Sequence, residues 1–186
     1  MKRAVLLTLI VVALAQAYAS AEIADSAANG FTYKTTLNLQ APPETVYQRL
    51  LAVGSWWGSD HTFSGDARNM SIDPRPMGCW CEKLPNGGAV RHMQVVMLMP
   101  GKMLVITGGL GPLQSIAATG SMSFRLLSAA GGTKLEIRYA VTGYLPAGMN
   151  TLAGPVDQVL TQQFTRFKNY VEKGDPAPKG DTPPRQ

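Results

Sequence analysis

The fold is decided by residues 155–173, PVDQVLTQQFTRFKNYVEK. Apolar side chains recur in this stretch at three- and four-residue spacing, which is the period of an amphipathic helix. The predicted stripe consists of Val156, Val159, Leu160, Gln163, Phe164, Phe167, Tyr170 and Val171. At a rise of 1.5 Å per residue the helix is about 28 Å long. It therefore needs a partner surface along its whole length.

The ends of this helix are also marked in the sequence. Pro155 suits the first helical position, where its missing N–H is not required, and Gly174 suits the left-handed residue just past the end. Arg166, Lys168 and Lys173 place positive charge towards the negative end of the helix dipole. The spacing thus predicts a helix over residues 155–173.

Most of the chain before this helix is predicted to form strands. Over residues 31–39, Phe, Tyr, Thr, Leu and Leu alternate with polar side chains, which is typical of a half-buried strand. Residues 42–44, Pro-Pro-Glu, then begin a short helix, and Gly54 and Ser55 end it. An aromatic segment containing Trp56 and Trp57 follows.

Turn sequences divide the middle of the chain into further strands. Residues 85–88, 100–101 and 130–132 are rich in Pro, Gly, Asn and Ala and separate runs with strand-like alternation. Consecutive hairpins of this kind predict an antiparallel meander. The predicted fold class is therefore α+β: an antiparallel sheet wrapped around a long C-terminal helix, with two short helices after the first strand.

The N-terminus has the pattern of a secretory signal peptide. Lys2 and Arg3 precede an apolar run over residues 4–15, and small residues offer cleavage sites after Ala19 or Ala21. The run is about twelve residues, against about twenty for a membrane span. We therefore expect a secreted or periplasmic protein that is not stably inserted in a membrane. The predicted divisions are a signal peptide (1–21), an N-terminal linker (22–30), one domain (31–173) and a disordered Pro-rich tail (174–186).

The charge does not favour a nucleic-acid partner. Cleavage removes Lys2 and Arg3 but no acidic residue, so the formal net charge falls from +5 to +3. The remaining basic residues are scattered and form no patch interleaved with aromatics. No cofactor is expected either, because the glycines of residues 108–111 are not followed by the Lys-Ser or Lys-Thr and the helix of a phosphate loop.

The order of elements resembles the SRPBCC superfamily, the START-like or Bet v helix-grip fold, over residues 31–173. Three segments resemble its heat-shock ATPase-activator-homologue and polyketide-cyclase-like branches: residues 39–47 (LQAPPETVY), Trp56-Trp57, and residues 78–82 (GCWCE). The resemblance implies a cavity between sheet and helix that holds a small hydrophobic or aromatic molecule. The side chains predicted to line it are Trp56, Trp57, Cys79, Cys81, Met93, Met122, Tyr139, Phe164 and Phe167.

Cys79 and Cys81 are the only cysteines. Residues two apart in a regular strand have Cα atoms about 6.6 Å apart and parallel Cβ vectors, which does not favour a disulfide. We therefore expect two reduced thiols on one face of the strand, with a redox-active bridge as the alternative. A zinc site formed with His61 and His92 is a further hypothesis, but the cysteines lack the converging spacing of structural zinc sites.

The sequence supports a non-catalytic carrier better than an enzyme, because no complete catalytic set is visible. Two alternatives stay open. One is a cyclase- or hydrolase-like enzyme that uses Glu82 or His92 as a general base in the cavity. The other is a protein-interaction module like the ATPase-activator branch, whose best-known target is a cytoplasmic chaperone and which a signal peptide disfavours.

Overall fold

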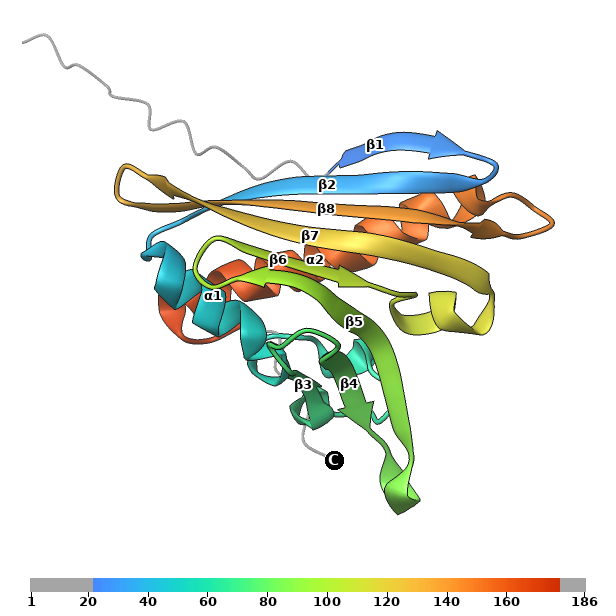
Figure 1. Cartoon of the computed structure of the whole chain (residues 1–186), viewed down its shortest axis with the longest axis horizontal. Coiled ribbons are helices and arrows are strands. Elements are labelled where there is room, and N and C mark those ends of the chain that lie inside the picture. The colour runs from blue at the N-terminus through green and yellow to red at the C-terminus, as the bar shows by residue number, and fades with distance from the viewer. Residues whose placement is uncertain (1–21, 178–186) are drawn as a thin grey trace, which may run out of the picture.

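The computed structural model describes residues 22–177 and contains an eight-stranded antiparallel sheet with the strand order β1-β2-β8-β7-β6-β5-β4-β3. The strands are β1 (Glu22–Ala27), β2 (Gly30–Leu39), β3 (Met70–Ile72), β4 (Cys79–Lys83), β5 (Ala89–Met99), β6 (Met103–Thr107), β7 (Ala117–Ala129) and β8 (Gly132–Tyr144). Figure 1 shows β2, β8 and β7 running along the length of the molecule, whereas β5, β4 and β3 turn away from them. The sheet is therefore strongly bent.

Helix α2 (Ala153–Lys173) lies along the inner face of this sheet (Figure 1). Its buried side chains are Ala153, Leu160, Gln163, Phe164, Phe167 and Val171. Phe164 packs against Tyr33 of β2 and Phe124 of β7, with ring centroids 6.2 and 6.0 Å apart. Most of the predicted stripe is thus the face that the sheet covers, and the predicted fold class is confirmed.

The short helices close the ends of the curved sheet. They are α1 (Pro43–Leu51) and the 3-10 helices η1 (Val53–Ser55), η2 (Ser59–His61), η3 (Ala67–Asn69), η4 (Pro85–Gly87), η5 (Gly111–Ser115) and η6 (Met149–Leu152). Val46, Tyr47 and Leu50 of α1 are buried in the same core as α2. Within residues 22–177 we find no helix with the length and apolar content of a membrane-spanning segment.

Two predicted boundaries differ from the structure. Helix α2 begins at Ala153, because Pro155 is tolerated throughout the first turn, while Gly174 ends it with φ 76° as expected. Residues 22–27 of the predicted linker form β1, whose backbone pairs with β2. The signal peptide and most of the predicted tail lie outside the described residues.

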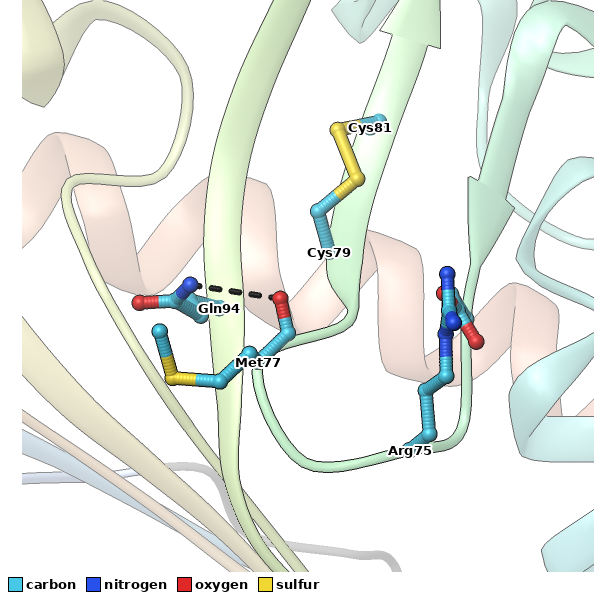
Figure 2. Close-up of a disulfide and its surroundings, with 6 residues drawn as sticks. Arg75, Met77, Cys79, Cys81 and Gln94 are labelled. Carbon is cyan, nitrogen blue, oxygen red and sulfur yellow. Dashed lines mark hydrogen bonds and ion pairs between the residues drawn. A yellow bond between two sulfur atoms is a disulfide. The ribbon is translucent and has the colours of Figure 1, made fainter.

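Cys79 and Cys81 are joined by a disulfide (Figure 2). The prediction of two free thiols is therefore wrong, because the assumption of a regular strand at Trp80 is wrong. The Cα atoms of the two cysteines lie 5.3 Å apart, against about 6.6 Å in a regular strand. The β4–β5 register shifts between Trp80 and Cys81, and this irregularity accompanies the shorter distance that a bridge needs.

The cysteines also face away from the core. Trp80 and Glu82 alternate with them along β4 and are fully buried, whereas Cys79 and Cys81 are half-buried. Successive side chains of a strand point to opposite faces. The disulfide therefore lies on the outer face of the sheet, which rules out both cysteines as cavity lining and as ligands of a zinc ion.

Candidate ligand-binding cavity

A cavity of about 500 Å³ lies between the N-terminal half of α2 and the bent part of the sheet. This volume is within the range of small-molecule sites, about 300 to 1,000 Å³. Pro155, Val156, Val159 and Leu160 of α2 form one wall. The segment from Leu110 to Ile116, which includes η5, forms another wall. The rest of the lining includes residues 60–63, Trp57, His92 and Tyr139.

The walls are mainly apolar, and Tyr139 contributes one of the few polar atoms. Its hydroxyl donates to the Gly108 carbonyl at 3.1 Å and accepts the Leu110 N–H at 3.2 Å. Burial raises the pKa of Tyr139 to about 12, so the hydroxyl stays protonated at neutral pH. Because both hydrogen bonds are internal, Tyr139 fixes the start of the η5 wall.

A buried ionisable pair, Glu82 and His92, adjoins the cavity. The side chains of Glu82 on β4 and His92 on β5 are 0% and 2% exposed, and His92 lines the cavity. The Glu82 Oε2 and His92 Nε2 atoms are 3.0 Å apart. Glu82 also accepts the backbone N–H groups of Phe63 and Ser64. One carboxylate thus holds both the imidazole and the loop beside the cavity.

A bulge in β5 places His92 in this position. Trp80 pairs with Met93 and Cys81 pairs with Arg91, so His92 has no partner in the register. His92 and Met93 are adjacent in the chain and yet both are buried. A bulge inserts one extra residue into a strand and re-aims a side chain. The irregularity is therefore what turns the imidazole towards the cavity.

The hydrogen bonds define the protonation of the pair. Burial raises the pKa of Glu82, but hydrogen bonds from Ser64, Phe63 and His92 outweigh it, so the net pKa lies below the usual value. Burial lowers the pKa of His92, and Glu82 opposes this only in part. An ionised Glu82 can only accept a hydrogen bond, so the Nε2 atom that faces it must be the donor. The neutral imidazole therefore carries its proton on Nε2. Nδ1 is then an acceptor, and the Gln114 amide lies 3.3 Å from it.

The loop after α1 forms the mouth of the cavity. The Phe63 ring is 54% exposed and stacks on His92, with centroids 5.8 Å apart. The Trp57 indole N–H donates to the His61 carbonyl at 2.9 Å. The Gly58 N–H donates to the buried Gln163 side chain of α2 at 2.7 Å. These contacts attach the mouth both to the sheet and to α2.

The predicted site residues separate into three groups. Trp57, Tyr139, His92 and His61 line the cavity. The others on the inner face are buried residues that lie outside the lining: Trp56, Glu82, Met93, Met122, Phe164 and Phe167. The third group consists of Cys79 and Cys81, which form the disulfide on the outer face of the sheet. Within the described residues no group of three or more His, Cys, Asp or Glu side chains could hold a metal ion, and no contact between His61 and His92 is found there.

Sequence reasoning missed much of the lining. The sequence pattern does not assign the Gly/Pro-rich segment around residues 108–112 to the site, yet Leu110 and Leu113 are buried and line the cavity together with Ile116. Leu110, Leu113 and Ile116 recur at three-residue spacing, which is a helical pattern, but they lie in a segment rich in Gly and Pro. Val156 and Val159 were assigned to the stripe of the long helix but not to the site.

By sequence the chain matches no family model and no curated protein. By structure it is similar to a conserved protein from Enterococcus faecalis (TM-score 0.58, 17% identity, covering 88% of this chain and 82% of that one). It is also similar to CalU16 from Micromonospora echinospora, with a TM-score of 0.57, 15% identity and coverage of 88% of this chain and 89% of that one. A third similar structure is Ara h 8.0201, with a TM-score of 0.54, 16% identity and coverage of 75% of this chain and 96% of that one. These likenesses show that the chain has the Bet v-like helix-grip fold.

Proposed function

We propose that this protein binds a small, mainly apolar or aromatic molecule in the cavity between α2 and the sheet. The observation that carries the proposal is the cavity itself, about 500 Å³ in volume, whose walls are mainly apolar side chains. Ligand sites usually combine such walls with a few fixed polar groups. Here His92 is one fixed polar group, since Glu82 orients its ring and the Gln114 amide faces its Nδ1 atom.

The experiment is a titration with 1-anilinonaphthalene-8-sulfonate, a fluorophore with apolar aromatic rings and one sulfonate group. We expect saturable binding of one probe per chain. Val159→Trp should weaken binding at least tenfold, because the added ring occupies the cavity. Val96→Trp is the matched control, because Val96 is 51% exposed on β5 and does not line the cavity. Equal binding by both variants would contradict the assigned site.

The natural ligand requires a separate measurement. Native mass spectrometry of the protein purified from its own compartment should show an added organic mass that Val159→Trp loses. We include export of the protein through its N-terminal signal peptide in this proposal, because the compartment determines which ligands are available to the cavity.

The buried pair favours one second candidate function, an enzyme that uses His92 as a general base. A carboxylate that accepts the Nε2 proton sets Nδ1 as the basic atom, so a substrate would have to displace the Gln114 amide that faces Nδ1. The burial that lowers the pKa of His92 keeps the ring neutral at neutral pH. Hydrolysis of p-nitrophenyl acetate and butyrate tests this candidate. A saturable rate that His92→Gln abolishes would support it, and a rate equal to that of the buffer would contradict it for esters.

A further inference from the structure

The disulfide on the outer face of β4 lies opposite the bulge that positions His92. The register shift lies between Trp80 and Cys81, and the unpaired residue on β5 is His92. Cys81 precedes Glu82 in the chain, and its register partner Arg91 precedes His92. Each member of the buried pair is thus one residue away from the bridged position. The bridge and the pair lie on opposite faces of the same two strands.

The bridge has a local role rather than a global one. Cys79 and Cys81 are separated by a single residue, and a disulfide that closes a short loop constrains the unfolded chain much less than one that closes a long loop. What the bridge does define is the spacing of β4, with Cα atoms 5.3 Å apart. A regular strand without the bridge would extend this distance to about 6.6 Å.

The ladder between β4 and β5 is anchored before the bridge. The Val95 N–H donates to the Gly78 carbonyl at 2.7 Å, and the Met77 N–H donates to the Val95 carbonyl at 3.0 Å. The Gln94 side chain donates to the Met77 carbonyl at 3.2 Å (Figure 2). An extension of β4 between residues 79 and 81 therefore changes the position of Glu82 relative to this anchor.

The surroundings of the bridge permit exchange with a thiol. Both cysteines are half-buried on the outer face, and Met77, two residues before Cys79, is 73% exposed. Arg91 is exposed and pairs directly with Cys81, so its side chain lies on the same outer face. A nearby guanidinium stabilises a thiolate. Cys81 is therefore the better leaving group, and Cys79 is the sulfur to be attacked.

We propose that Cys79–Cys81 is a thiol–disulfide exchange site for a dithiol, and that its reduction loosens the contact between Glu82 and His92 at the cavity. A thiolate of the dithiol attacks Cys79 Sγ, the Sγ–Sγ bond breaks, and Cys81 leaves as a thiolate. The second thiol of the dithiol resolves the mixed disulfide and releases Cys79. Two electrons pass from the dithiol to the bridge, and two protons end on the cysteine sulfurs.

The consequence for the cavity follows from Glu82, and this part rests on the proposed function. Glu82 holds the N–H groups of Phe63 and Ser64 as well as His92, so a shift of Glu82 releases the mouth of the cavity. We expect reduction to weaken binding of the fluorophore about tenfold, which is within the usual range of coupling between linked sites. Reoxidation should restore it.

The experiment uses the mature protein with dithiothreitol and then with oxidised dithiothreitol. The chain has two cysteines, so the reductant has a single target. Intact mass and alkylation should show two thiols formed reversibly without denaturant, and the NMR signals of the His92 ring should shift. A variant carrying both Cys79→Ser and Cys81→Ser should show the probe binding and the His92 signals of the reduced protein. Dithiothreitol should change neither of them. If that variant does not fold, the comparison of the reduced and the reoxidised wild type is sufficient for the test.

The outcomes separate this proposal from the proposed function. A bridge that resists dithiothreitol until the protein is denatured would overturn the exchange site. Reduction that leaves both the His92 signals and probe binding unchanged would overturn the coupling. Absence of probe binding by the oxidised wild type would instead contradict the proposed function, while the mass and NMR measurements would still decide the redox proposal.

Discussion

Glu82 is the residue on which most of the site depends. It accepts hydrogen bonds from His92 and from two backbone N–H groups while fully buried. Glu82→Ala leaves the buried His92 N–H and two partly buried backbone N–H groups without an acceptor, and it should lower the free energy of unfolding by about 1 to 3 kcal/mol. Glu82→Gln keeps an acceptor oxygen and should cost less. Urea denaturation of both variants checks this, and equal losses would show that side-chain volume rather than hydrogen bonding matters.

His92 should make the stability depend on pH. Its pKa in the folded protein is lowered from 6.5, chiefly by burial, so below pH 6.5 the unfolded chain binds a proton that the native state does not. Stability is then complete above pH 6.5 and falls as the pH decreases. Glu82, with its pKa lowered from 4.5, adds a second loss below pH 4.5.

Urea denaturation between pH 8 and pH 4 measures this dependence, and His92→Gln is the control. The glutamine amide can still donate to Glu82 but does not titrate. We expect the variant to lose the decrease between pH 7 and pH 5 and to keep the decrease below pH 4.5. An identical curve for both proteins would assign the upper step to another group.

Sequence reasoning identified both members of this pair but not their contact. Glu82 and His92 were candidate bases by residue type alone, since ten positions of a hairpin separate them and the register was unknown. The contact depends on the extra residue in β5, and a period-two pattern does not predict a bulge. The same irregularity explains why the geometric argument against the disulfide failed. Trp56 and Trp57 show a similar limit, because the sequence does not tell which of the two adjacent residues lies in the core and which lines the cavity.

Among the secondary-structure elements, the alternation of apolar and polar residues predicted the strands that bury one face. Residues 31–39 are predicted almost to the residue as β2. Strand β1 was missed because its residues, EIADSA, are exposed apart from Ile23. Such an edge strand is held by backbone pairing with β2 and leaves no hydrophobic pattern. The short helix η5 was missed for a related reason, since Gly and Pro conceal its apolar spacing.

Helix α2 provides the sharpest test of the core. Phe167 is fully buried and packs edge-on against Trp56, with ring centroids 5.1 Å apart. Phe167→Ala should therefore lower the free energy of unfolding by about 3 to 5 kcal/mol. Tyr144→Ala is the control, because Tyr144 is 72% exposed and should change stability by less than about 0.5 kcal/mol. Chemical denaturation of both variants decides whether α2 is held as tightly as its burial indicates.

At the scale of the whole molecule, export is a prediction from the sequence. Cleavage after Ala19 or Ala21 would give a mature N-terminus at Ser20 or Glu22. Either cut leaves β1 whole, because that strand begins at Glu22. N-terminal sequencing of the protein isolated from its own compartment checks this. An intact Met1 on a cytosolic protein would contradict export and favour the chaperone-partner hypothesis.

The cavity and the fold are coupled, because a ligand that binds only the folded protein stabilises it. Saturation with the fluorophore at one hundred times its Kd should add about 2.7 kcal/mol. For a domain of this size that corresponds to a rise in Tm of roughly 5 to 10 °C. With binding at least tenfold weaker, Val159→Trp should show at most about half of this rise. Its own Tm without the probe should stay close to that of the wild type, because Val159 faces the cavity.

Thermal denaturation with and without the probe measures this, with Val96→Trp as the matched control. Val96 is exposed on β5, so its variant should keep the full rise in Tm. If Val159→Trp keeps the rise as well, the probe binds elsewhere on the surface. If Val159→Trp melts several degrees below the wild type without probe, the space beside α2 is too small for an indole and is a packed wall. The two results are independent, so the experiment tests both the position of the ligand and the existence of the space it would fill.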